Sequence, residues 1–493
     1  MKGKLLLIIL DGWGIGKSNE SNAIYLAKTP FYDSLWEQYP HSILAASGRA
    51  VGLLAGQIGS SEVGHLHIGA GRMVTQELAK IRHAIDSGDF YKNEFFLKIC
   101  EIAKRNRGSL HLAGLLSDGG VHSHGDQLWA LLMLAKRHGL SRIFVHAFLD
   151  GRDCPPNAAL EYVSFFQAKM KRWIVGRIAS LCGRYFAMDR DANWELIDRV
   201  ADLLILGHGS AYASIKVALE ASYRQGICDE YVEPVLLEPD GIIKSGDAVI
   251  FCNFRADRMR ELLTRVKNRL ANLSILTMTP YGVEFSAIES AFSQDLPSDH
   301  LSAVLAGAQV PELKVAESQK YAHVTYFFNS GVEAPYPGEA RIMIPSLKVP
   351  SYDLAPEMSA PQITETVLTN LGSYPVIIVN YANGDMVGHS GKMGPAIQAA
   401  ECIDRQLSRL VPAALASGYR IIVTADHGNL EQMVDEQTGL PHTAHTTNPV
   451  PLILIGEKFV SLKSTGALYN IAPTILELLD IDKPSAMVSS LLR

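Results

Sequence analysis

Three apolar runs in this chain end in side chains that can bind metal ions. The run LLLIIL ends at Asp11, YPVIIVN leads to Asp385 and His389, and YRIIVTA ends at Asp426 and His427. Unbroken runs of leucine and β-branched residues predict strands that are buried on both faces of a parallel sheet. In such sheets the reactive groups collect beyond the carboxyl ends of the strands. We therefore expect one shared site, and a metal-dependent enzyme built on an α/β sheet.

The length of the chain predicts two domains, because 493 residues exceed the roughly 250–300 residues over which one hydrophobic core usually grows. The metal-type residues lie near both ends of the chain, and a set of arginines lies between them. We favour a middle domain inserted into the first, because Asp11 otherwise has no partners nearby. The alternative is two sequential domains with the N-terminal strand crossing over.

Composition excludes some partners and compartments. A net charge of −6 argues against nucleic acid as a partner, and no apolar stretch approaches the ~18 residues of a membrane span. The N-terminal MKGKLLLIILDGWG could suggest a signal peptide, but its apolar run is short and lacks a small-residue cleavage site, so a first strand is favoured. The six cysteines form no CxxC pair, which indicates reduced thiols and a cytoplasmic protein.

The order of elements also follows from the patterns. We predict a strand over residues 4–10, a helix around residues 22–38 and a Gly-rich stretch over residues 48–71. In the middle block, SLHLAGLL, RIFVHAFL and AVIFCNF predict strands, and residues 126–138 predict the helix of a βαβ unit. Residues 287–300 look like a linker, and a second strand–helix series begins at Leu313.

The spacing of the metal-type residues supports a site. Asp385 and His389 are four residues apart, which suits a helical turn or a tight loop, and His445 lies in the polar segment PHTAHTTNPVP. Mixed carboxylates and imidazoles suit Mn²⁺, Zn²⁺ or Mg²⁺. There are more such ligands than one tetrahedral ion needs, so we expect two cations, an arrangement typical of phosphoryl transfer.

Phosphoryl transfer to the protein requires a nucleophile, and Ser61 in GSSEVGH is the candidate. The segment also resembles a helix N-cap. The two interpretations are compatible, since a serine at a helix start can lose its proton to attack phosphorus while backbone N–H groups hold the phosphate.

Cationic side chains follow the predicted strands of the middle block. A lone surface arginine is usually a solvated group, but a set at one sheet edge predicts a clamp for phosphate and carboxylate oxygens. Arg255 and Arg258 would share one face if NFRADRMRE opens a helix. Asp153 could hold or deprotonate a substrate hydroxyl. The candidates are His122, Arg152, Asp153, Arg184, Arg190, Arg255 and Arg258, with Lys320 from the later segment AESQKYAHVT.

With these residues in view, the chain resembles the cofactor-independent phosphoglycerate mutases, a branch of the alkaline phosphatase superfamily. The resemblance runs end to end and is carried, in order, by LDGWG, SSEVGH, SDGGVHSH, DGRD, GRYFAMDRD, NFRADRMRE, QKYAHVT, PSYDLAPEMSA, NGDMVGHSG, ADHGN and HTAHTTNPVP. The sequence departs from the usual pattern at Ser60, where the family commonly has Asn, at Ala-Asn-Trp after MDRD, and at YFFNSG.

The resemblance implies a division of labour among these residues. It implies a phosphatase-like metal domain made of residues 1–75 and 296–493, with an inserted substrate-binding transferase domain over residues 76–295. One metal would be held by Asp385, His389 and His445, and the second by Asp11, Ser61, Asp426 and His427. Substrate contacts would come from His122, Arg152, Asp153, Arg184, Arg190, Arg255, Arg258 and Lys320.

The activity implied by the resemblance is interconversion of 3-phosphoglycerate and 2-phosphoglycerate without bisphosphoglycerate. Ser61 would become a phosphoserine, Asp153 or His122 would move protons, and domain closure would exclude water. We expect a cytoplasmic monomer with two divalent cations, Mn²⁺ foremost and Mg²⁺, Zn²⁺ or Co²⁺ as alternatives, and phosphoglycerate as its small-molecule partner. The rival hypotheses are a related phosphomutase or phosphatase with another substrate, and a catalytically silent binding protein.

Overall fold

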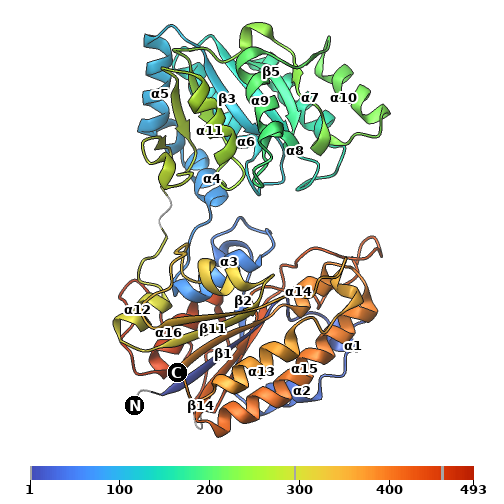
Figure 1. The fold of residues 1–493 in the computed structure, drawn as a ribbon, viewed down its shortest axis with the longest axis vertical. Helices are drawn as coiled ribbons and strands as arrows, with labels where there is room; N and C mark the ends of the chain where they lie inside the picture. The colour runs from blue at the N-terminus through green and yellow to red at the C-terminus, as the bar shows by residue number, and fades with distance from the viewer. Residues whose placement is uncertain (1–2, 294–295, 457–459) are drawn as a thin grey trace. The chain divides into compact units, whose positions relative to one another are not determined.

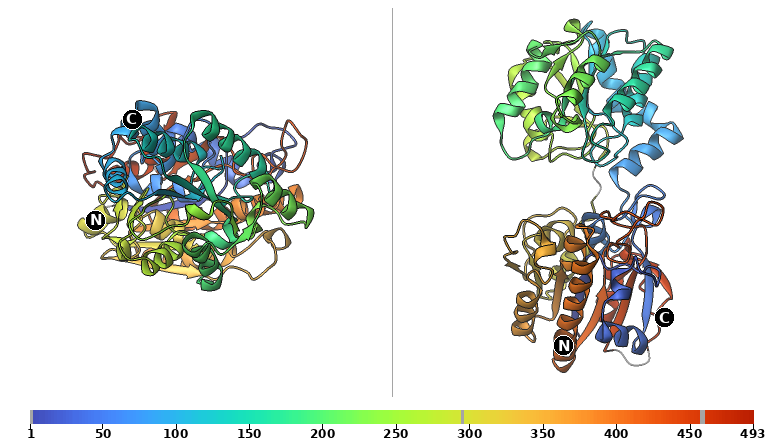
Figure 2. Two further views of the ribbon diagram at one scale, coloured as in Figure 1. Left: turned by 90° about the horizontal axis from the view of Figure 1, so that it is seen from above. Right: turned by 90° about the vertical axis from the view of Figure 1, so that its right-hand side faces the viewer.

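The computed structural model of the chain describes residues 3–293, 296–456 and 460–493. The chain divides into two compact units. Unit 1 contains residues Met1–Gln76 and Leu296–Arg493, and unit 2 contains Glu77–Asp295. The two ends of the chain therefore belong to the same unit, as Figure 2 shows for the blue N-terminal and the red C-terminal segments.

Unit 1 is built on an eight-stranded sheet with the strand order β12-β11-β13-β1-β14-β15-β2-β16. The strands β12, β11, β13, β1 and β14 are parallel, and β15 is antiparallel to both of its neighbours. The bounds are β1 (Lys4–Leu10), β2 (His41–Ala45), β11 (Glu312–Glu317), β12 (Glu339–Ile344), β13 (Val376–Tyr381), β14 (Tyr419–Thr424), β15 (Val450–Ile455) and β16 (Thr465–Ala467).

Two layers of helices cover this sheet (Figure 1), so its central strands are buried on both faces. The helices α1 (Ala23–Leu26), α2 (Pro30–Gln38), α13 (Ala360–Asn370) and α15 (Met393–Ala416) pack together on one face. The helices α3 (Ser61–Ala70), α12 (Leu301–Gly307) and α16 (Ile471–Leu478) pack together on the other. The short helix α14 (Asn383–Gly388) follows β13 and contacts α15.

Unit 2 repeats the architecture with its own eight-stranded sheet, in the order β10-β9-β8-β3-β4-β5-β7-β6. All of its pairings are parallel except that of β5 with β7. The strands are β3 (Leu110–Leu115), β4 (Ile143–Leu149), β5 (Arg177–Gly183), β6 (Ser210–Ala211), β7 (Val235–Leu236), β8 (Ala248–Phe251), β9 (Ser274–Thr277) and β10 (Glu289–Ser290).

Two separate hydrophobic cores lie on the two faces of this second sheet, and alternate residues of β3 and β8 belong to each. One core includes residues of α5 (Glu94–Arg105), α6 (Gly125–Arg137), α7 (Ala159–Trp173) and α10 (Ile215–Arg224), with α4 (Glu77–Ser87) beside them. The other includes α8 (Arg184–Ala187), α9 (Trp194–Leu206) and α11 (Arg260–Arg269). The predicted α/β class with parallel sheets is confirmed.

Three local predictions require correction. The single helix predicted over residues 22–38 is two helices, because Pro30 begins α2 and cannot donate the hydrogen bond needed to continue α1. Arg255 and Arg258 precede α11, which begins at Arg260, so they lie in the irregular segment and turn before the helix and not on a helical face. The predicted linker starts too early, because Glu289 and Ser290 form β10 beside β9; residues 294–295 of that linker lie outside the described residues.

Helices that could cross a lipid bilayer are absent from the described part of the chain: none there is both long enough and apolar enough.

Candidate metal centre and arginine group

The metal-type residues meet at the carboxyl edge of the unit 1 sheet because β1 lies between β13 and β14. Ile9 pairs with Thr424, so Asp11 and Asp426, each two residues further on, leave the sheet at the same level. Gly12 follows with a positive φ of 78°, and a Cβ there would lie 2.6 Å from the backbone nitrogen of Asp385. The glycine therefore allows the loops that carry Asp11 and Asp385 to touch, and Asp385 N–H donates to the carbonyl of Asp11 at 2.9 Å.

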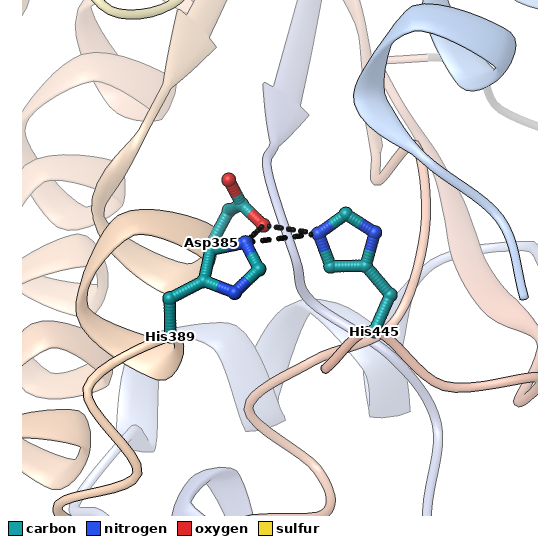
Figure 3. A group of neighbouring side chains, drawn as sticks. All are labelled: Asp385, His389 and His445. Carbon is teal, nitrogen blue, oxygen red and sulfur yellow. Dashed lines mark hydrogen bonds and ion pairs between the residues drawn. The ribbon is translucent and has the colours of Figure 1, made fainter. Parts of the chain in front are cut away.

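Within this region, two groups of side chains have the composition of metal sites. Asp385, His389 and His445 form one group, whose potential ligand atoms all lie within 4.8 Å of one another. Figure 3 shows the imidazole of His445 pointing from its loop towards Asp385 and His389, which lie on and just after α14. The Nε2 of His445 is 2.8 Å from Asp385 Oδ1 and 3.1 Å from His389 Nε2. The structure thus brings together the three residues that the resemblance implied for one metal.

The second group contains Asp11, Asp426 and His427, all fully buried. Ser61 belongs beside them, because its Oγ is 3.1 Å from Asp11 Oδ1 and 2.9 Å from His427 Nε2. His427 Nε2 is also 3.7 Å from Asp385 Oδ1, so the two groups adjoin. We call the seven residues Asp11, Ser61, Asp385, His389, Asp426, His427 and His445 the metal-type cluster.

The imidazoles of the cluster are oriented as metal ligands usually are. The Nδ1 atoms of His389, His427 and His445 face the backbone carbonyls of Thr443, Gly428 and Gly59, at 2.7, 3.2 and 2.9 Å. In the neutral tautomer that donates from Nδ1, the lone pair lies on Nε2 and is directed into the cluster. The Nε2 atoms of His389 and His445 lie 3.1 Å apart, and a cation between them, a proton or a metal ion, removes the repulsion of two lone pairs. Two imidazole nitrogens beside a carboxylate are a donor set that fits a divalent metal.

The burial and the charges of the cluster also indicate a site for a cation. Asp426 Oδ2 is buried and makes no hydrogen bond to a described residue. Burial alone would raise the pKa of Asp385, but the ammonium of Lys320 and the neighbouring imidazoles hold it well below its usual range. Burial would lower the pKa of His427, yet Asp426, Asp11 and Asp385 raise it to about 9. The cluster therefore attracts positive charge strongly.

Lys320 lies in this cluster, although its sequence context grouped it with the substrate-binding cations. Its Nζ donates to Asp11 Oδ1 at 2.8 Å, to Ser61 Oγ at 2.7 Å and to Asp385 Oδ2 at 2.6 Å. Burial would lower the pKa of Lys320, but Asp11, Asp385 and Asp426 raise it above its ordinary value. The side chain is thus a permanent cation that faces the hydroxyl of Ser61.

The remaining candidates form a second set in unit 2, beyond the carboxyl ends of β3, β4, β5 and β8. We call this set the arginine group: His122, Arg152, Asp153, Arg184, Arg190, Arg255 and Arg258. Burial and the nearby guanidinium groups of Arg190, Arg184 and Arg152 lower the pKa of Arg258. Like charges held close together in this way attract an anion.

Three acidic residues hold parts of the arginine group in place. Arg184 NH1 donates to Asp150 Oδ1 at 2.7 Å and to Asp153 Oδ2 at 2.5 Å. Asp257 Oδ2 accepts from Arg190 at 3.1 Å, and its other oxygen lies 3.5 Å from Arg255 Nε. His122 lies close by, with Nδ1 3.9 Å from Asp257 Oδ1. Burial, with Arg184 and Arg255, lowers the pKa of His122 to about 3, so its imidazole is neutral.

Sequence reasoning missed several of the residues that support these groups. Asp150 accepts from Ser117 Oγ, Arg184 and the backbone N–H groups of Arg152 and Asp153. A polar residue that directly follows a strand, as in FLDGRD, is the signal that could have found it.

In unit 1, Asn380 was missed in the same way. Its Nδ2 donates to Asp11 Oδ2 at 2.8 Å and lies 3.0 Å from His65 Nε2. The signal was the lone amide in the apolar run VIIVNY.

Comparison with known proteins decides the family. The sequence profile of the Metalloenzyme superfamily matches residues 3–483. The chain is 46% identical, over 98% of its length and 97% of the relative's, to the 2,3-bisphosphoglycerate-independent phosphoglycerate mutase of Moorella thermoacetica. It is 44% identical to the enzyme of the same name from Pseudomonas fluorescens, over 99% and 98% of the two chains. This chain belongs to the 2,3-bisphosphoglycerate-independent phosphoglycerate mutases.

A solved structure of a phosphoglycerate mutase agrees with this assignment. The Leishmania mexicana phosphoglycerate mutase, determined at low cobalt concentration, matches 100% of this chain and 98% of its own, with a TM-score of 0.80 and 31% identity. The metalloenzyme superfamily and the donor set of the cluster both support the use of divalent metal by this phosphoglycerate mutase.

Proposed function

We propose that this chain interconverts 3-phosphoglycerate and 2-phosphoglycerate without bisphosphoglycerate, through a phosphoserine at Ser61. The observation that carries the proposal is the environment of Ser61 Oγ, which lies within 3.1 Å of Lys320 Nζ, His427 Nε2 and Asp11 Oδ1. A hydroxyl among a cation, an imidazole and a carboxylate is the arrangement of an activated nucleophile.

The backbone around Ser61 supports the same role. Ser61 is the first residue of α3, and the Oγ of Ser60 caps the helix by accepting from Val63 N–H at 3.4 Å. The positive end of the helix dipole and the amides of the first turn favour a phosphoryl group at this position. The Ser60 hydroxyl thus fills the capping position, where the family commonly has an asparagine.

The metal-type cluster would hold two cations, one at Asp385, His389 and His445 and one at Asp11, Ser61, Asp426 and His427. When bound, divalent cations would supply positive charge that lowers the pKa of the serine hydroxyl and offsets the charge of the transferring phosphoryl group. Lys320 adds a fixed positive charge from the protein itself, and it donates directly to Ser61 Oγ.

The reaction then needs two transfers. Ser61 Oγ gives up its proton and forms a bond to phosphorus, the bond from phosphorus to one glycerate oxygen breaks, and that oxygen takes a proton. In the second transfer the other glycerate hydroxyl gives up a proton and takes the phosphoryl group, the bond from phosphorus to Oγ breaks, and Oγ takes a proton again. We assign the proton transfers to Asp153 or His122, because Asp153 is fixed by Arg184 and His122 is neutral.

The arginine group would retain the glycerate while the phosphoryl group is on the serine. Arg152, Arg184, Arg190, Arg255 and Arg258 offer paired donors that suit carboxylate and phosphate oxygens. Retention of the alcohol is what separates a mutase from a phosphatase, so the presence of the arginine group supports the mutase assignment.

We further propose that Mn²⁺ is the metal, because oxygen and imidazole donors are mixed in both groups, and that the protein is a cytoplasmic monomer. Metal analysis of the purified protein and its size in solution test the first and last of these proposals.

A coupled assay tests the whole proposal. The chelator-stripped protein, restored with MnCl₂ and given 3-phosphoglycerate without bisphosphoglycerate, should form 2-phosphoglycerate, release little inorganic phosphate, and carry phosphate on Ser61 by mass spectrometry. Release of inorganic phosphate as the main product would identify a phosphatase instead. A metal-loaded protein that forms neither product would overturn the proposal.

A further inference from the structure

Glu431 is a buried carboxylate to which the motifs discussed above give no role. Its side chain is 2% exposed. Oε2 accepts from the backbone N–H groups of Gly14 at 3.2 Å and Asn429 at 2.7 Å. Oε1 accepts from the side chains of Thr446 and Asn448, the latter at 3.0 Å. Both oxygens are therefore fully engaged as acceptors.

These four donors come from three loops that are far apart in the sequence. Gly14 lies in the loop that carries Asp11, and Asn429 follows Asp426 and His427. Thr446 and Asn448 lie directly after His445. Each loop joined by Glu431 thus carries at least one residue of the metal-type cluster.

The backbone of these loops packs tightly on the carboxylate. A Cβ added at Gly14 would lie 2.3 Å from Glu431, one at Gly428 also 2.3 Å, and one at Gly16 2.8 Å. Because four hydrogen bonds hold the carboxylate, it could not move aside cheaply for a side chain at these positions. The glycines thus let the loops close around Glu431.

We propose that Glu431 is a positioning residue for the metal centre: it sets the relative positions of the loops that carry Asp11, Asp426–His427 and His445. This inference rests on the proposed function, in which those residues bind divalent cations. Glu431 acts through the loops, since among the described residues its hydrogen bonds go to Gly14, Asn429, Thr446 and Asn448 and to none of the cluster side chains. All of its partners are donors, so the role needs two acceptor oxygens, which glutamine cannot supply.

The test compares Glu431→Gln with the matched control Glu436→Gln. Glu436 lies five residues away and forms an exposed ion pair with Lys17. In calorimetric titration of the chelator-stripped proteins with MnCl₂, Glu431→Gln should bind roughly 10–100-fold more weakly than wild type. Glu436→Gln should bind like wild type. Excess Mn²⁺ should restore much of the turnover of Glu431→Gln, whereas its KM for 3-phosphoglycerate should stay within about twofold.

Two results separate this inference from the proposed function. If the wild-type protein binds no Mn²⁺, the proposed function fails first. If wild type binds Mn²⁺ and Glu431→Gln binds it equally well, the positioning role is wrong and the proposed function stands.

A milder variant covers the case in which Glu431→Gln does not fold. Asn448→Ala removes one donor and leaves the carboxylate in place, and its Mn²⁺ affinity should fall several-fold with little change in the melting temperature of the metal-free protein. Wild-type affinity in a folded Asn448→Ala variant would overturn the inference.

Discussion

The two candidate groups differ in how the protein handles charge. In unit 1, Asp11, Asp426 and His427 are fully buried, and Lys320, which is 3% exposed, lies among the carboxylates. In unit 2, the side chains of Arg152 and Arg190 are 57% and 50% exposed, and the latter makes its ion pair with Asp257, which is itself partly exposed. One group lies wholly in the interior, whereas the other extends from the buried Arg184 and His122 to the exposed Arg152 and Arg190.

The difference follows from the signs of the charges. Carboxylates can be buried when a lysine and imidazoles offset their charge, and the positions of all these groups are then fixed by packing. Several guanidinium groups repel one another. If all of them were buried without an anion, they would lose their hydration and nothing would offset their charge. In the proposed function, the reacting atoms are thus preorganised by the fold, whereas a substrate anion would complete the arginine group.

The largest effect should come from Ser61→Ala. This change removes the proposed nucleophile from the preorganised group, so turnover should fall by at least about 10⁴-fold and no phosphoserine should form. The control is Ser60→Ala, which removes the N-cap of α3 and should cost about 1 kcal/mol of stability while the phosphoenzyme still forms. Turnover near that of wild type in Ser61→Ala would remove the basis for calling unit 1 the reacting unit.

The second-largest effect should come from removing the positive charge of Lys320 in unit 1. Lys320→Met leaves Asp11 and Asp385 buried without their cation, so the metal-free protein should lose roughly 3–5 kcal/mol of unfolding free energy. Turnover should fall about 10²-fold or more, because Ser61 Oγ also loses a charged donor. Thermal melts with and without Mn²⁺ check the first effect, and part of the loss should return with the metal. Unchanged stability without metal would show that Lys320 does not offset these charges.

A smaller effect is expected in unit 2. Arg184→Lys keeps the charge but loses the planar guanidinium whose NH1 holds both Asp150 and Asp153, so KM for 3-phosphoglycerate should rise about 10-fold or more. Arg177→Lys is the control, since Arg177 pairs with Glu238 and Asp240 on the surface, and its KM should not change. Equal effects of the two variants would mean that the arginine group does not bind the substrate.

The smallest effect concerns stability at acid pH. Burial lowers the pKa of His67 to about 4, and the neutral ring faces the carbonyl of Val63 and accepts from Val74 N–H. An unfolded histidine titrates near 6.5, so the unfolded chain binds more protons than the native protein between pH 6.5 and 4. Stability therefore falls as the pH falls through this window, and His67 contributes about 2 kcal/mol of loss between pH 7 and 5.

Melting experiments on the metal-free protein check this pH dependence. His67→Gln should lose less stability than wild type over the same pH range, and replacement of the exposed His41 by Gln should make no difference. Equal acid losses in wild type and His67→Gln would show that the buried imidazole is not the cause.

Local patterns predicted the central strands β1, β3, β4, β8, β13 and β14, because burial on both faces of a parallel sheet leaves a continuous apolar run. They also placed Asp11, Asp385 and Asp426 at one sheet edge, since adjacent parallel strands end at the same edge. They failed for Arg255 and Arg258, which were expected on one face of a helix but precede the first helical residue, Arg260.

Supporting residues escaped prediction for a different reason. Asp150, Asn380 and Glu431 each have hydrogen-bond partners that are distant in the sequence. A local pattern can mark the polar residue, but it does not identify the distant partner. Lys320 was grouped with cations that lie in the other unit, because its sequence context shows its charge and not its neighbours.

The sequence by itself determined the class of fold, the family, and the kinds of side chain available for chemistry, because these depend on local periodicity and on motifs. Only the tertiary structure decided which side chains share one buried volume. Lys320, Asn380 and Glu431 came to the metal centre through strand order and loop packing. A buried charge or hydrogen-bond donor without a partner destabilises the folded protein. The positions of these side chains therefore depend on partners that lie far away in the sequence.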